Sequence, residues 1–525
     1  MTKILVSDPI TDAGMAILQD AGFEVKYLPD SSPGDKAEAC KDVAGWIVRS
    51  GTNVTAEMIE SADHLQVIGR AGVGVDNIDI SGATRKGILV MNTPNASTYS
   101  AAEHTVAMML ALSRNIPMGH STIMDGKWNR NALVGSELRN KTLGVVGLGK
   151  IGREVIKRCR AFDMNILGFD PYVNQDIFNE EAVKIVDIDK LTQESDYITV
   201  HVPLTDSTRS LFDYDRLCTM KQTARIINVA RGGVIKEAGL ARALNEEKIA
   251  GAAIDVFSSE PIDASNPLVR AKNIVLTPHL GASTKEAKEG VSQAVCEQVR
   301  DYLLNNQLSN AINMPITDLA KLKEIQFHLN LSEIMGKLQS QLGSKEIKKV
   351  HIECAGIMDQ AKPITLAFLK GFLANRVKEK VNYINAETLA TNLGVNVEYG
   401  MSDNIGNYSN VIKTVVTDKN ISNEIHGSVF EGNQLRLVNI LGYEMDIVPS
   451  ETMLFMRNKD YPGVIGKVGA TLGDANVNIG AYLLNRGLDN GEAFAVIRVD
   501  NNVPHEIIET LSEFPEIISL QQINC

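Results

Sequence analysis

Three glycines in the middle of the chain have the spacing of a phosphate-binding turn. Gly147, Gly149 and Gly152 stand in VVGLGKIGREV, directly after an apolar run, and a helical pattern opens at Lys150. In such a turn the first glycine allows the tight bend, the second lets backbone approach a pyrophosphate, and the third lets the helix pack on the strand. Amide groups at the helix N-terminus then hold the phosphates. The spacing predicts a dinucleotide-binding turn.

An acidic residue follows this turn at the distance that a ribose contact requires. The next apolar run, NILGFD, ends in Asp170, roughly 20 residues past the last glycine. A carboxylate there would accept hydrogen bonds from both ribose hydroxyls and repel a 2′-phosphate, so we expect NAD rather than NADP. The alternative is that Asp170 only caps a turn before Pro171.

The elements that must position these residues alternate between short strands and helices. One series runs through KILVSDPI, FEVKYL, GWIVRS, LQVIGRA and GILVMNTP, with a helical pattern from Thr11 to Ala21 after its first member. A second series runs through TLGVVGLG, NILGFD, YITVHVP, ARIINVA, GAAIDVF and NIVLTP. Such alternation predicts βαβ units with parallel sheets, and therefore an α/β fold. We expect STYSAAEHTVAMMLALSRNI, apolar around much of its surface, to be a buried helix between the two series.

The position of the glycine turn in mid-chain indicates that one domain is inserted into another. We expect a Rossmann-type dinucleotide domain at 98–283, inserted in a flavodoxin-like domain made of 1–97 and 284–316. Fresh strands (KKVHIECAG, VVTDK, LRLVNILG) predict an α+β region at 317–450. The last block, 451–525, alternates strand, helix, strand, strand, helix, strand.

Composition limits the class of protein. The 525 residues suggest about three to four domains, and the net charge of −12 argues against nucleic acid as a partner. No apolar run approaches the ~20 residues that span a bilayer, and the N-terminus lacks a signal-peptide layout. The six cysteines form no CxxC pair, which predicts reduced thiols, no zinc-finger metal site and a cytoplasmic location.

Three segments that follow the glycine turn resemble the D-isomer-specific 2-hydroxyacid dehydrogenases. They are NVARGGVI, AAIDVFSSEP and TPHLGAST, and the resemblance assigns catalysis to Arg231, Glu260 and His279. The chemistry suits these types: imidazole takes the alcohol proton, a carboxylate orients the imidazole, and a planar guanidinium grips a substrate carboxylate. Taken singly, each could be a loop arginine, a surface glutamate or a histidine satisfied in a turn. Their joint occurrence behind the glycine turn favours catalysis.

The same resemblance implies further cofactor contacts. Lys150 and Ile151 would lie at the pyrophosphate, Val202 beside the adenine, Val229 and Ala230 at the nicotinamide, and Asp255 would bond its carboxamide. The remaining cofactor contacts implied are Arg231, His279, Gly281, Ala282 and Val73. Val73 and Val202 stand where some relatives have threonine, which removes a possible hydroxyl contact.

The segments IVRSGT and VIGRAGVGVDNID resemble the substrate loops of the phosphoglycerate dehydrogenases. The implied substrate contacts are Arg49, Ser50, Arg70, Gly72, Val73 and Gly74, joined by Arg231 and His279. Several cationic donors suit a doubly anionic substrate such as 3-phosphoglycerate. The alternative is that Arg49 and Arg70 form surface salt bridges. Arg130 is a further candidate, for the site of a neighbouring subunit.

The C-terminal parts also resemble that branch of the family. The region 317–450 is similar to its intervening domain, and 451–525 is similar to an ACT domain with a ferredoxin-like fold. The resemblance places contacts to an L-serine effector at Asn458, Asp460 and Asn478. The alternative is a tail that only joins subunits. We expect the basic residues Lys345, Lys348 and Lys349 to be a solvated face.

Together these features predict an NAD-dependent enzyme that oxidises 3-phospho-D-glycerate to 3-phosphohydroxypyruvate and so starts L-serine biosynthesis. The resemblance implies a homotetramer, with a dimer as minimum, regulated by serine through the tail. No metal, membrane or nucleic acid is expected to take part. The alternatives are a reductase of another 2-oxo acid, such as 2-oxoglutarate, and a non-catalytic NAD-binding sensor of the corepressor kind.

Overall fold

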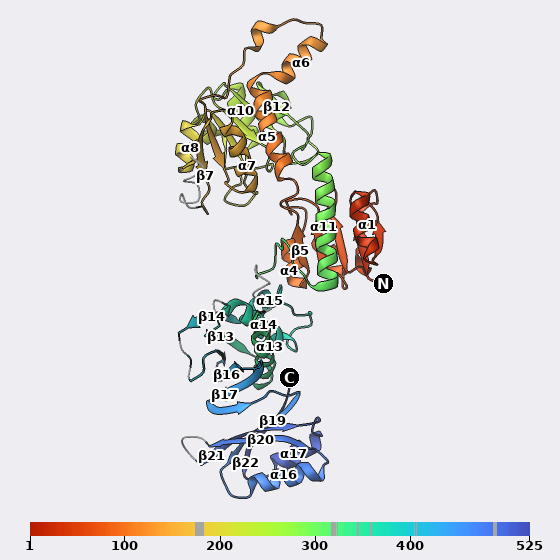
Figure 1. Cartoon of the computed structure of the whole chain (residues 1–525), viewed down its shortest axis with the longest axis vertical. Helices are drawn as coiled ribbons and strands as arrows, with labels where there is room; N and C mark the ends of the chain where they lie inside the picture. The colour runs from red at the N-terminus through yellow and green to blue at the C-terminus, as the bar shows by residue number, and fades with distance from the viewer. Residues whose placement is uncertain are drawn as a thin grey trace. The chain divides into compact units, whose positions relative to one another are not determined.

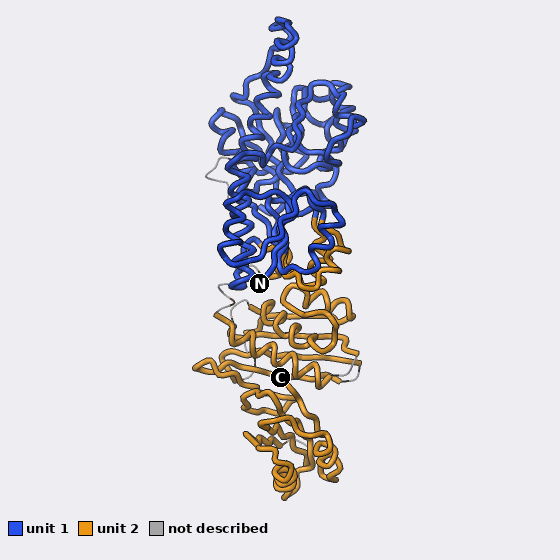
Figure 2. The backbone as a smooth tube through the Cα atoms, turned by 90° about the vertical axis from the view of Figure 1, so that its right-hand side faces the viewer, with its two compact units in different colours: residues 1–53, 68–77, 91–310 blue, residues 54–67, 78–90, 311–525 orange. Residues whose placement is uncertain are grey.

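The computed structural model describes residues 1–173, 183–316, 322, 324–343, 346–357, 360–403, 405, 407–419, 421–486 and 491–525. Lys345 lies outside this set. The chain forms two compact units, one of residues 1–53, 68–77 and 91–310 and the other of residues 54–67, 78–90 and 311–525 (Figure 2). Within the described part of the chain, no helix has the length and apolar character needed to cross a membrane.

The N-terminal series forms a five-stranded sheet with the order β2-β1-β3-β4-β5. This is the strand order of flavodoxin-like folds, so that expectation is confirmed. Its strands are β1 (Lys3–Val6), β2 (Glu24–Tyr27), β3 (Gly45–Val48), β4 (Val67–Arg70) and β5 (Leu89–Asn92), and its helices are α1 (Asp12–Asp20), α2 (Pro33–Ala39), α3 (Ala56–Ser61) and α4 (Ile80–Lys86). Helix α1 begins where the predicted helical pattern does, because the Thr11 side chain accepts the amide of Gly14.

The second series forms a seven-stranded sheet with the order β12-β11-β10-β9-β6-β7-β8, and all its neighbouring strands are parallel. Six of these strands have the Rossmann order, and β12 extends the sheet. The strands are β6 (Thr142–Val146), β7 (Asn165–Phe169), β8 (Val183–Ile185), β9 (Tyr197–Val200), β10 (Arg225–Asn228), β11 (Gly251–Ile254) and β12 (Ile274–Leu276). The helices are α7 (Lys150–Arg160), α8 (Ile188–Glu194), α9 (Tyr214–Cys218) and α10 (Glu237–Asn245). The short β8 was not predicted.

Two long helices carry the chain between the two sheets (Figure 1). Helix α5 (Thr98–Ser113), followed by α6 (Ile116–Met124), leads from β5 toward β6, and α11 (Lys285–Asn305) returns after β12. Helix α11 packs closely on the first sheet, since a Cβ on Gly69 would lie 2.7 Å from Val295 and from Val299. The Rossmann sheet is therefore an insertion between β5 and α11, as predicted.

The second unit contains a six-stranded sheet with the order β14-β13-β15-β16-β17-β18. Its strands are β13 (Ile347–Ala355), β14 (Asn396–Ser402), β15 (Val411–Asp418), β16 (Ser422–Phe430), β17 (Gln434–Ile440) and β18 (Tyr443–Ile447). Its helices are α13 (Gln326–Leu342), α14 (Ala361–Leu373) and α15 (Ala386–Asn392). Helices α13 and α14 meet at glycines: a Cβ on Gly336 would lie 2.1 Å from the Phe368 carbonyl oxygen.

The C-terminal block forms an antiparallel sheet with the order β20-β21-β19-β22 and two helices. The elements are β19 (Thr452–Lys459), α16 (Val464–Asp474), β20 (Ile479–Arg486), β21 (Glu492–Val499), α17 (His505–Ser512) and β22 (Ile517–Asn524). This succession is the predicted ferredoxin-like βαββαβ fold. One face of the sheet packs with α16 and α17 in a core of its own. Side chains of the other face, among them Phe455 and Phe494, belong to the core that contains α13 and α14.

Candidate active site

The predicted nucleotide and catalytic residues gather at the carboxyl edge of the Rossmann sheet. Gly147 follows β6, Asp170 follows β7, Val229 follows β10 and Asp255 follows β11. In a parallel sheet these strand ends lie along one edge, where ligands bind beside the point at which strand order reverses. That point falls between β6 and β9.

The glycine turn has the geometry of a pyrophosphate cradle. Gly147 has a φ of 96°, and a Cβ there would lie 2.5 Å from the His201 carbonyl oxygen. A Cβ on Gly152 would lie 2.2 Å from the carbonyl oxygen of Gly147, whereas a Cβ on Gly149 would meet nothing within 4 Å. Gly147 and Gly152 therefore have to be glycine because protein atoms occupy the place of a Cβ, whereas Gly149 faces open space. Helix α7 begins at Lys150, as predicted.

Asp170 holds this turn from the end of β7. Its Oδ2 accepts the amide of Leu148 at 2.9 Å, and its Oδ1 accepts the amide of Tyr172 at 3.0 Å. The carboxylate is thus fixed beside the turn, and the lone pairs left on its oxygens can accept ribose hydroxyls. The open space at Gly149, the exposed N-terminus of α7 and this acid fit a dinucleotide without a 2′-phosphate.

His279 and Glu260 form a hydrogen-bonded pair. Nδ1 of His279 lies 2.7 Å from Oε2 of Glu260, and Oε1 of Glu260 accepts the amide of Phe257 at 2.9 Å. Burial raises the pKa of Glu260, but the hydrogen bonds from His279 and Phe257 outweigh it, so the pKa is lower than usual. The carboxylate therefore stays ionised and orients the imidazole with its Nε2 edge free to face a substrate.

The loop that carries His279 is held in an unfavourable conformation. His279 has a φ of 53°, in the left-handed region, which costs of order 1–3 kcal/mol for a residue with a side chain. Its amide donates to the Asp255 carbonyl oxygen at 2.9 Å. The carboxylate of Asp255 accepts the amides of Leu280 at 2.8 Å and Gly281 at 2.9 Å. Asp255, itself fully buried, thus fixes the loop on both sides of His279.

Arg231 reaches the glycine loop that follows β4. Its Nε donates to Oδ2 of Asp76 at 2.9 Å, and its Nη1 donates to the Ala230 carbonyl oxygen at 2.7 Å. A Cβ on Gly74 would lie 1.7 Å from Nη2 of Arg231, so only glycine lets the guanidinium lie there. Arg231 and Gly74, two of the predicted substrate residues, therefore lie side by side. Asp76 was not predicted.

Arg70 lies beside the same loop and close to two other arginines. A Cβ on Gly72 would lie 1.5 Å from its Nη1. Burial and the charges of Arg231 and Arg49 lower the pKa of Arg70 to about 10. Its buried Nε has no hydrogen-bond partner among the described residues. A buried guanidinium with an unused donor and cationic neighbours is a place where an anion would be stabilised.

The other predicted substrate residues surround this cluster. The Arg49 amide donates to Oδ2 of Asp8 at 2.5 Å, and Ser50 is exposed beside it. The amide of Gly72 donates to Oγ1 of Thr93 at 2.8 Å and is therefore occupied within the protein. The backbone amides of Val73 and Gly74 are the remaining candidate donors to a substrate in this loop.

The remaining predicted cofactor residues lie on the strand-end loops. Val202 lies next to Gly147, within 2.9 Å of where a Cβ would stand. The Ala230 amide donates to Oδ1 of Asn228 at 3.0 Å, which fixes the turn after β10. Ile151 is in the first turn of α7, and Ala282 is exposed after Gly281.

Asn458 and Asp460 lie at one end of the C-terminal sheet. Asn458 is 1% exposed, and its Oδ1 has no partner within the described part of the chain. Asp460 donates its amide to the Gly491 carbonyl oxygen at 2.7 Å and pairs with Arg486 at 2.8 Å.

Asn478 lies at the other end of that sheet. Its side chain donates to Oδ2 of Asp500 at 2.6 Å. Asp500 follows β21, whose opposite end pairs with Asn458. The three predicted effector residues therefore do not form one pocket within a single chain.

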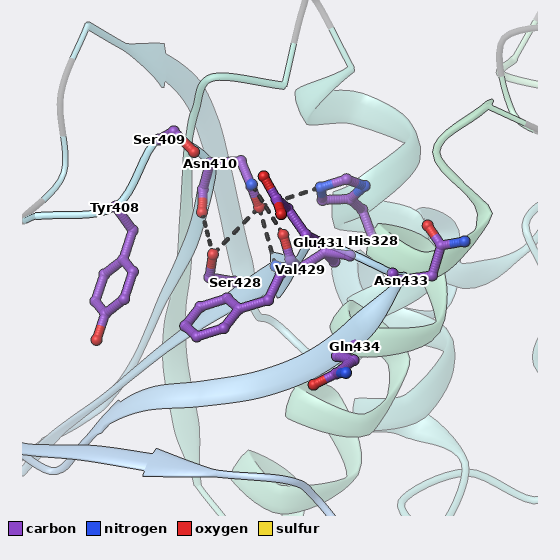
Figure 3. A pocket seen from close by; sticks show the side chains of 11 residues that line it. His328, Tyr408, Ser409, Asn410, Ser428, Val429, Glu431, Asn433 and Gln434 are labelled. Carbon is purple, nitrogen blue, oxygen red and sulfur yellow. Dashed lines mark hydrogen bonds between the residues drawn. The ribbon is translucent and has the colours of Figure 1, made fainter.

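One pocket of about 670 Å³ in the second unit involves none of the predicted residues (Figure 3). It is lined by His328 on α13 and by the loops around Asn410 and Glu431. Oδ1 of Asn410 accepts the amide of Val429 at 2.9 Å and lies 3.3 Å from Nε2 of His328. Asn410, which directly precedes β15, thus connects α13 to the last turn-proximal residues of β16.

Sequence reasoning missed three side chains that contact the site: Asp76, Ser100 and His104. Ser100 Oγ donates to the Gly281 carbonyl oxygen at 2.8 Å, and Nε2 of His104 lies 3.1 Å from Oδ1 of Asp255. Both stand in a segment predicted only as a buried helix. Their spacing of one helical turn was the available signal, because it places both side chains on one face.

A dinucleotide cradle on a Rossmann sheet, joined to a histidine–carboxylate pair and an arginine cluster, defines a nicotinamide-dependent dehydrogenase of 2-hydroxy acids. Comparison with known families agrees. Residues 106–281 match the D-isomer specific 2-hydroxyacid dehydrogenase NAD binding domain. Residues 324–441 match the D-3-phosphoglycerate dehydrogenase intervening domain.

Relatives that match over their full length identify the branch of the family more narrowly. A D-3-phosphoglycerate dehydrogenase of Methanocaldococcus jannaschii is 40% identical, with all of both chains covered. One of Bacillus subtilis is 36% identical, again with all of both chains covered. A NAD-dependent formate dehydrogenase from Staphylococcus aureus, solved in complex with NAD, superposes with a TM-score of 0.54 at 30% identity, covering 59% of this chain and 99% of that one. The chain belongs to the D-3-phosphoglycerate dehydrogenase family.

Proposed function

We propose that this protein oxidises 3-phospho-D-glycerate to 3-phosphohydroxypyruvate with NAD⁺, as the first committed step of L-serine biosynthesis. The observation that carries the proposal is the cluster of Arg49, Arg70 and Arg231, in which the buried Nε of Arg70 has no hydrogen-bond partner among the described residues. The phosphate and the carboxylate of the substrate would add two negative groups to a cluster whose acidic neighbours include Asp8 and Asp76. Full-length relatives named for this activity support it.

In this proposal Arg231 binds the substrate carboxylate, and Arg49 and Arg70 bind the phosphate. Arg231 offers a planar fork whose orientation is fixed by Asp76 and by the carbonyl of Ala230. The backbone amides of Val73 and Gly74 add donors beside it. We also propose that 1–97 and 284–316 bind the substrate and that 98–283 binds NAD. Arg49 and Arg70, at the ends of β3 and β4, support the first assignment, and Gly147 and Asp170, after β6 and β7, support the second.

His279 then takes the proton of the substrate hydroxyl. The bound nicotinamide supplies the acceptor for the hydride that leaves the same carbon. The Nε2 edge of His279 receives the proton, and the positive charge that results is stabilised by Glu260, 2.7 Å from Nδ1. Asp170 selects NAD, because a 2′-phosphate would meet its carboxylate.

Appearance of NADH absorbance on mixing the protein with NAD⁺ and 3-phosphoglycerate tests this function. D-Glycerate and D-lactate are matched controls that lack the phosphate, and reduction of 2-oxoglutarate by NADH tests the alternative substrate class. We expect Arg70→Ala to weaken the binding of 3-phosphoglycerate much more than the binding of D-glycerate. Equal effects on both substrates, or turnover of 2-oxoglutarate alone, would contradict the assignment.

We also propose that L-serine regulates the enzyme through residues 451–525. The buried Oδ1 of Asn458, which has no hydrogen-bond partner among the residues that the structure describes, and the carboxylate of Asp460 lie at one end of the sheet and suit an ammonium group. Asn478 lies at the other end, so a site that uses all three must combine two chains. Serine titration calorimetry on the full-length protein tests this.

A homotetramer, with a dimer as its minimum, is proposed from the exposed apolar side chains around α6. Met124, Trp128 and Val134 are 74%, 84% and 80% exposed, which in a stable protein marks an interaction surface. Arg130 stands among them and would reach a neighbouring site. Light scattering on Trp128→Glu should show a smaller assembly. We place the enzyme in the cytoplasm, which the six free cysteines support.

A further inference from the structure

Helix α5 contacts the His279 loop through two side chains one turn apart. Ser100 Oγ donates to the carbonyl oxygen of Gly281 at 2.8 Å. Nε2 of His104 lies 3.1 Å from Oδ1 of Asp255 and 3.3 Å from Oγ1 of Thr277. The helix packs against β10, β11 and β12, whose ends carry the catalytic loops (Figure 1).

Asp255 is the centre of this contact. Its Oδ1 also accepts the hydroxyl of Thr277 at 2.6 Å and the amide of Leu280 at 2.8 Å. Its Oδ2 accepts the amide of Gly281. The side chain of Asp255 is 0% exposed, while that of His104 is 19% exposed. An entirely buried carboxylate keeps its position only if its donors do, because an unpaired one is costly in a medium of low polarity.

The contacts connect His104 to the backbone of His279. His104 bonds the carboxylate that holds Leu280 and Gly281, and the Asp255 carbonyl accepts the His279 amide. His279 has the left-handed φ of 53° that a chain leaves readily when such bonds are lost. The Nε2 of His279 would then move away from the substrate hydroxyl although Glu260 stayed in place.

We propose that His104 is a positioning residue, which acts through Asp255 to keep His279 in the conformation that accepts the substrate proton. The proposal rests on the proposed oxidation of 3-phosphoglycerate. Its chemistry is a hydrogen bond from an imidazole N–H, so a side chain with a donor at the same reach can replace it.

Two substitutions of His104 distinguish the effect of losing its hydrogen bond from the effect of changing its side-chain volume. His104→Gln keeps an N–H donor, and we expect turnover within about threefold of the wild type. His104→Leu removes the donor, and we expect kcat to fall about 30- to 100-fold, since a 1 Å misplacement of a reacting group has this effect. Ser113→Ala is the matched control, because it removes a buried hydroxyl from the same helix that bonds Met109 and Tyr197 instead.

A double-mutant cycle shows whether His104 acts through His279. In a His279→Ala background, His104→Leu should lower the residual rate by no more than about threefold, because the group that it positions is gone. A fall of 30-fold or more in that background would mean a general loss of structure and would overturn the proposal. So would wild-type kcat in His104→Leu.

Hydrogen exchange provides a readout that needs no turnover. Amides of Leu280 and Gly281 should exchange about tenfold faster in His104→Leu than in the wild type, in His104→Gln or in Ser113→Ala. Unchanged exchange in His104→Leu refutes the positioning role even if the wild type oxidises no 3-phosphoglycerate. Faster exchange in a protein without that activity would uphold the role of His104 and reject the substrate.

Discussion

Adding a single methyl group at Gly74 should damage substrate binding without damaging the fold. The Cβ of Gly74→Ala would lie 1.7 Å from Nη2 and 2.6 Å from Cζ of Arg231. Ordinary contact begins at 3.4 Å, so the guanidinium must retreat by about 1.7 Å. The retreat is possible, because the obstructing atoms are the end of a flexible side chain and Gly74 has no positive φ.

The size of this displacement of the Arg231 guanidinium allows the loss of activity to be estimated. Since a 1 Å misplacement costs roughly a hundredfold in rate, we expect kcat/KM for 3-phosphoglycerate to fall at least about a hundredfold. That corresponds to ~2.7 kcal/mol of lost transition-state stabilisation. The bond to Asp76 should be broken as well, so the loss should appear in KM and in kcat.

Initial rates of NADH formation at varied 3-phosphoglycerate measure this effect, and the quenching of protein fluorescence by NADH measures cofactor affinity. Gly74→Ala should bind NADH normally. Gly149→Ala should instead weaken the binding of NADH. Its Cβ would meet no protein atom within 4 Å, but it would occupy the space in which the pyrophosphate is expected to lie. Gly466→Ala, in open space on α16, is a silent control. Wild-type kcat/KM in Gly74→Ala would refute the placement of Arg231 in catalysis.

Four further changes test other parts of the protein. Asp170→Ala should lower the affinity for NAD⁺ and reduce the ratio of NAD⁺ to NADP⁺ affinity in cofactor titrations. If the wild type used both cofactors equally well, the ribose contact would be contradicted. His279→Ala should lower kcat by about a hundredfold or more and leave NADH binding intact, as judged by fluorescence. Glu260→Gln should lower kcat, measured by initial rates of NADH formation, because a neutral amide stabilises the imidazolium that forms on His279 less than a carboxylate does. The pKa of the Glu260 carboxyl is below its usual value. The stability that its ionised form gives the folded protein is therefore complete above about pH 4.3 and is lost only as the pH falls through the lowered pKa. Asp460→Ala should abolish inhibition by serine with basal turnover unchanged, and persistent inhibition would place the effector elsewhere.

The parts of the fold that could be predicted are those set by local sequence. The strand that ends just before Gly147 and the helix that begins at Lys150 follow from an apolar run and a glycine turn. Strand β8 was missed because an exposed lysine interrupts the apolar pattern of its three residues. The five-stranded, seven-stranded and ferredoxin-like sheets follow once the order of strands and helices is known.

The catalytic residues were predicted from the resemblance of three segments to a known family, because each residue type taken singly had another explanation. The structure brings two of them, His279 and Glu260, into hydrogen-bond contact. The bond from Arg231 to Asp76 joins residues 155 apart, and no local pattern signals such a contact. Nor does any local pattern predict that Asn478 and Asn458 lie at opposite ends of the C-terminal sheet, because this depends on how the strands pair.

The core shared by the intervening region and the C-terminal sheet makes these two parts one thermodynamic unit. Met453, Phe455, Phe494, Val496 and Ile523 are buried with side chains of α13, α14 and β17. Gln341 adds hydrogen bonds with the backbone of Asn524, at 2.6 and 3.0 Å. Removal of residues 451–525 would expose this apolar face to water, at roughly 25 cal/mol per Å². Whatever binds the tail therefore changes the stability of the intervening region too, so the tail is not a detachable sensor.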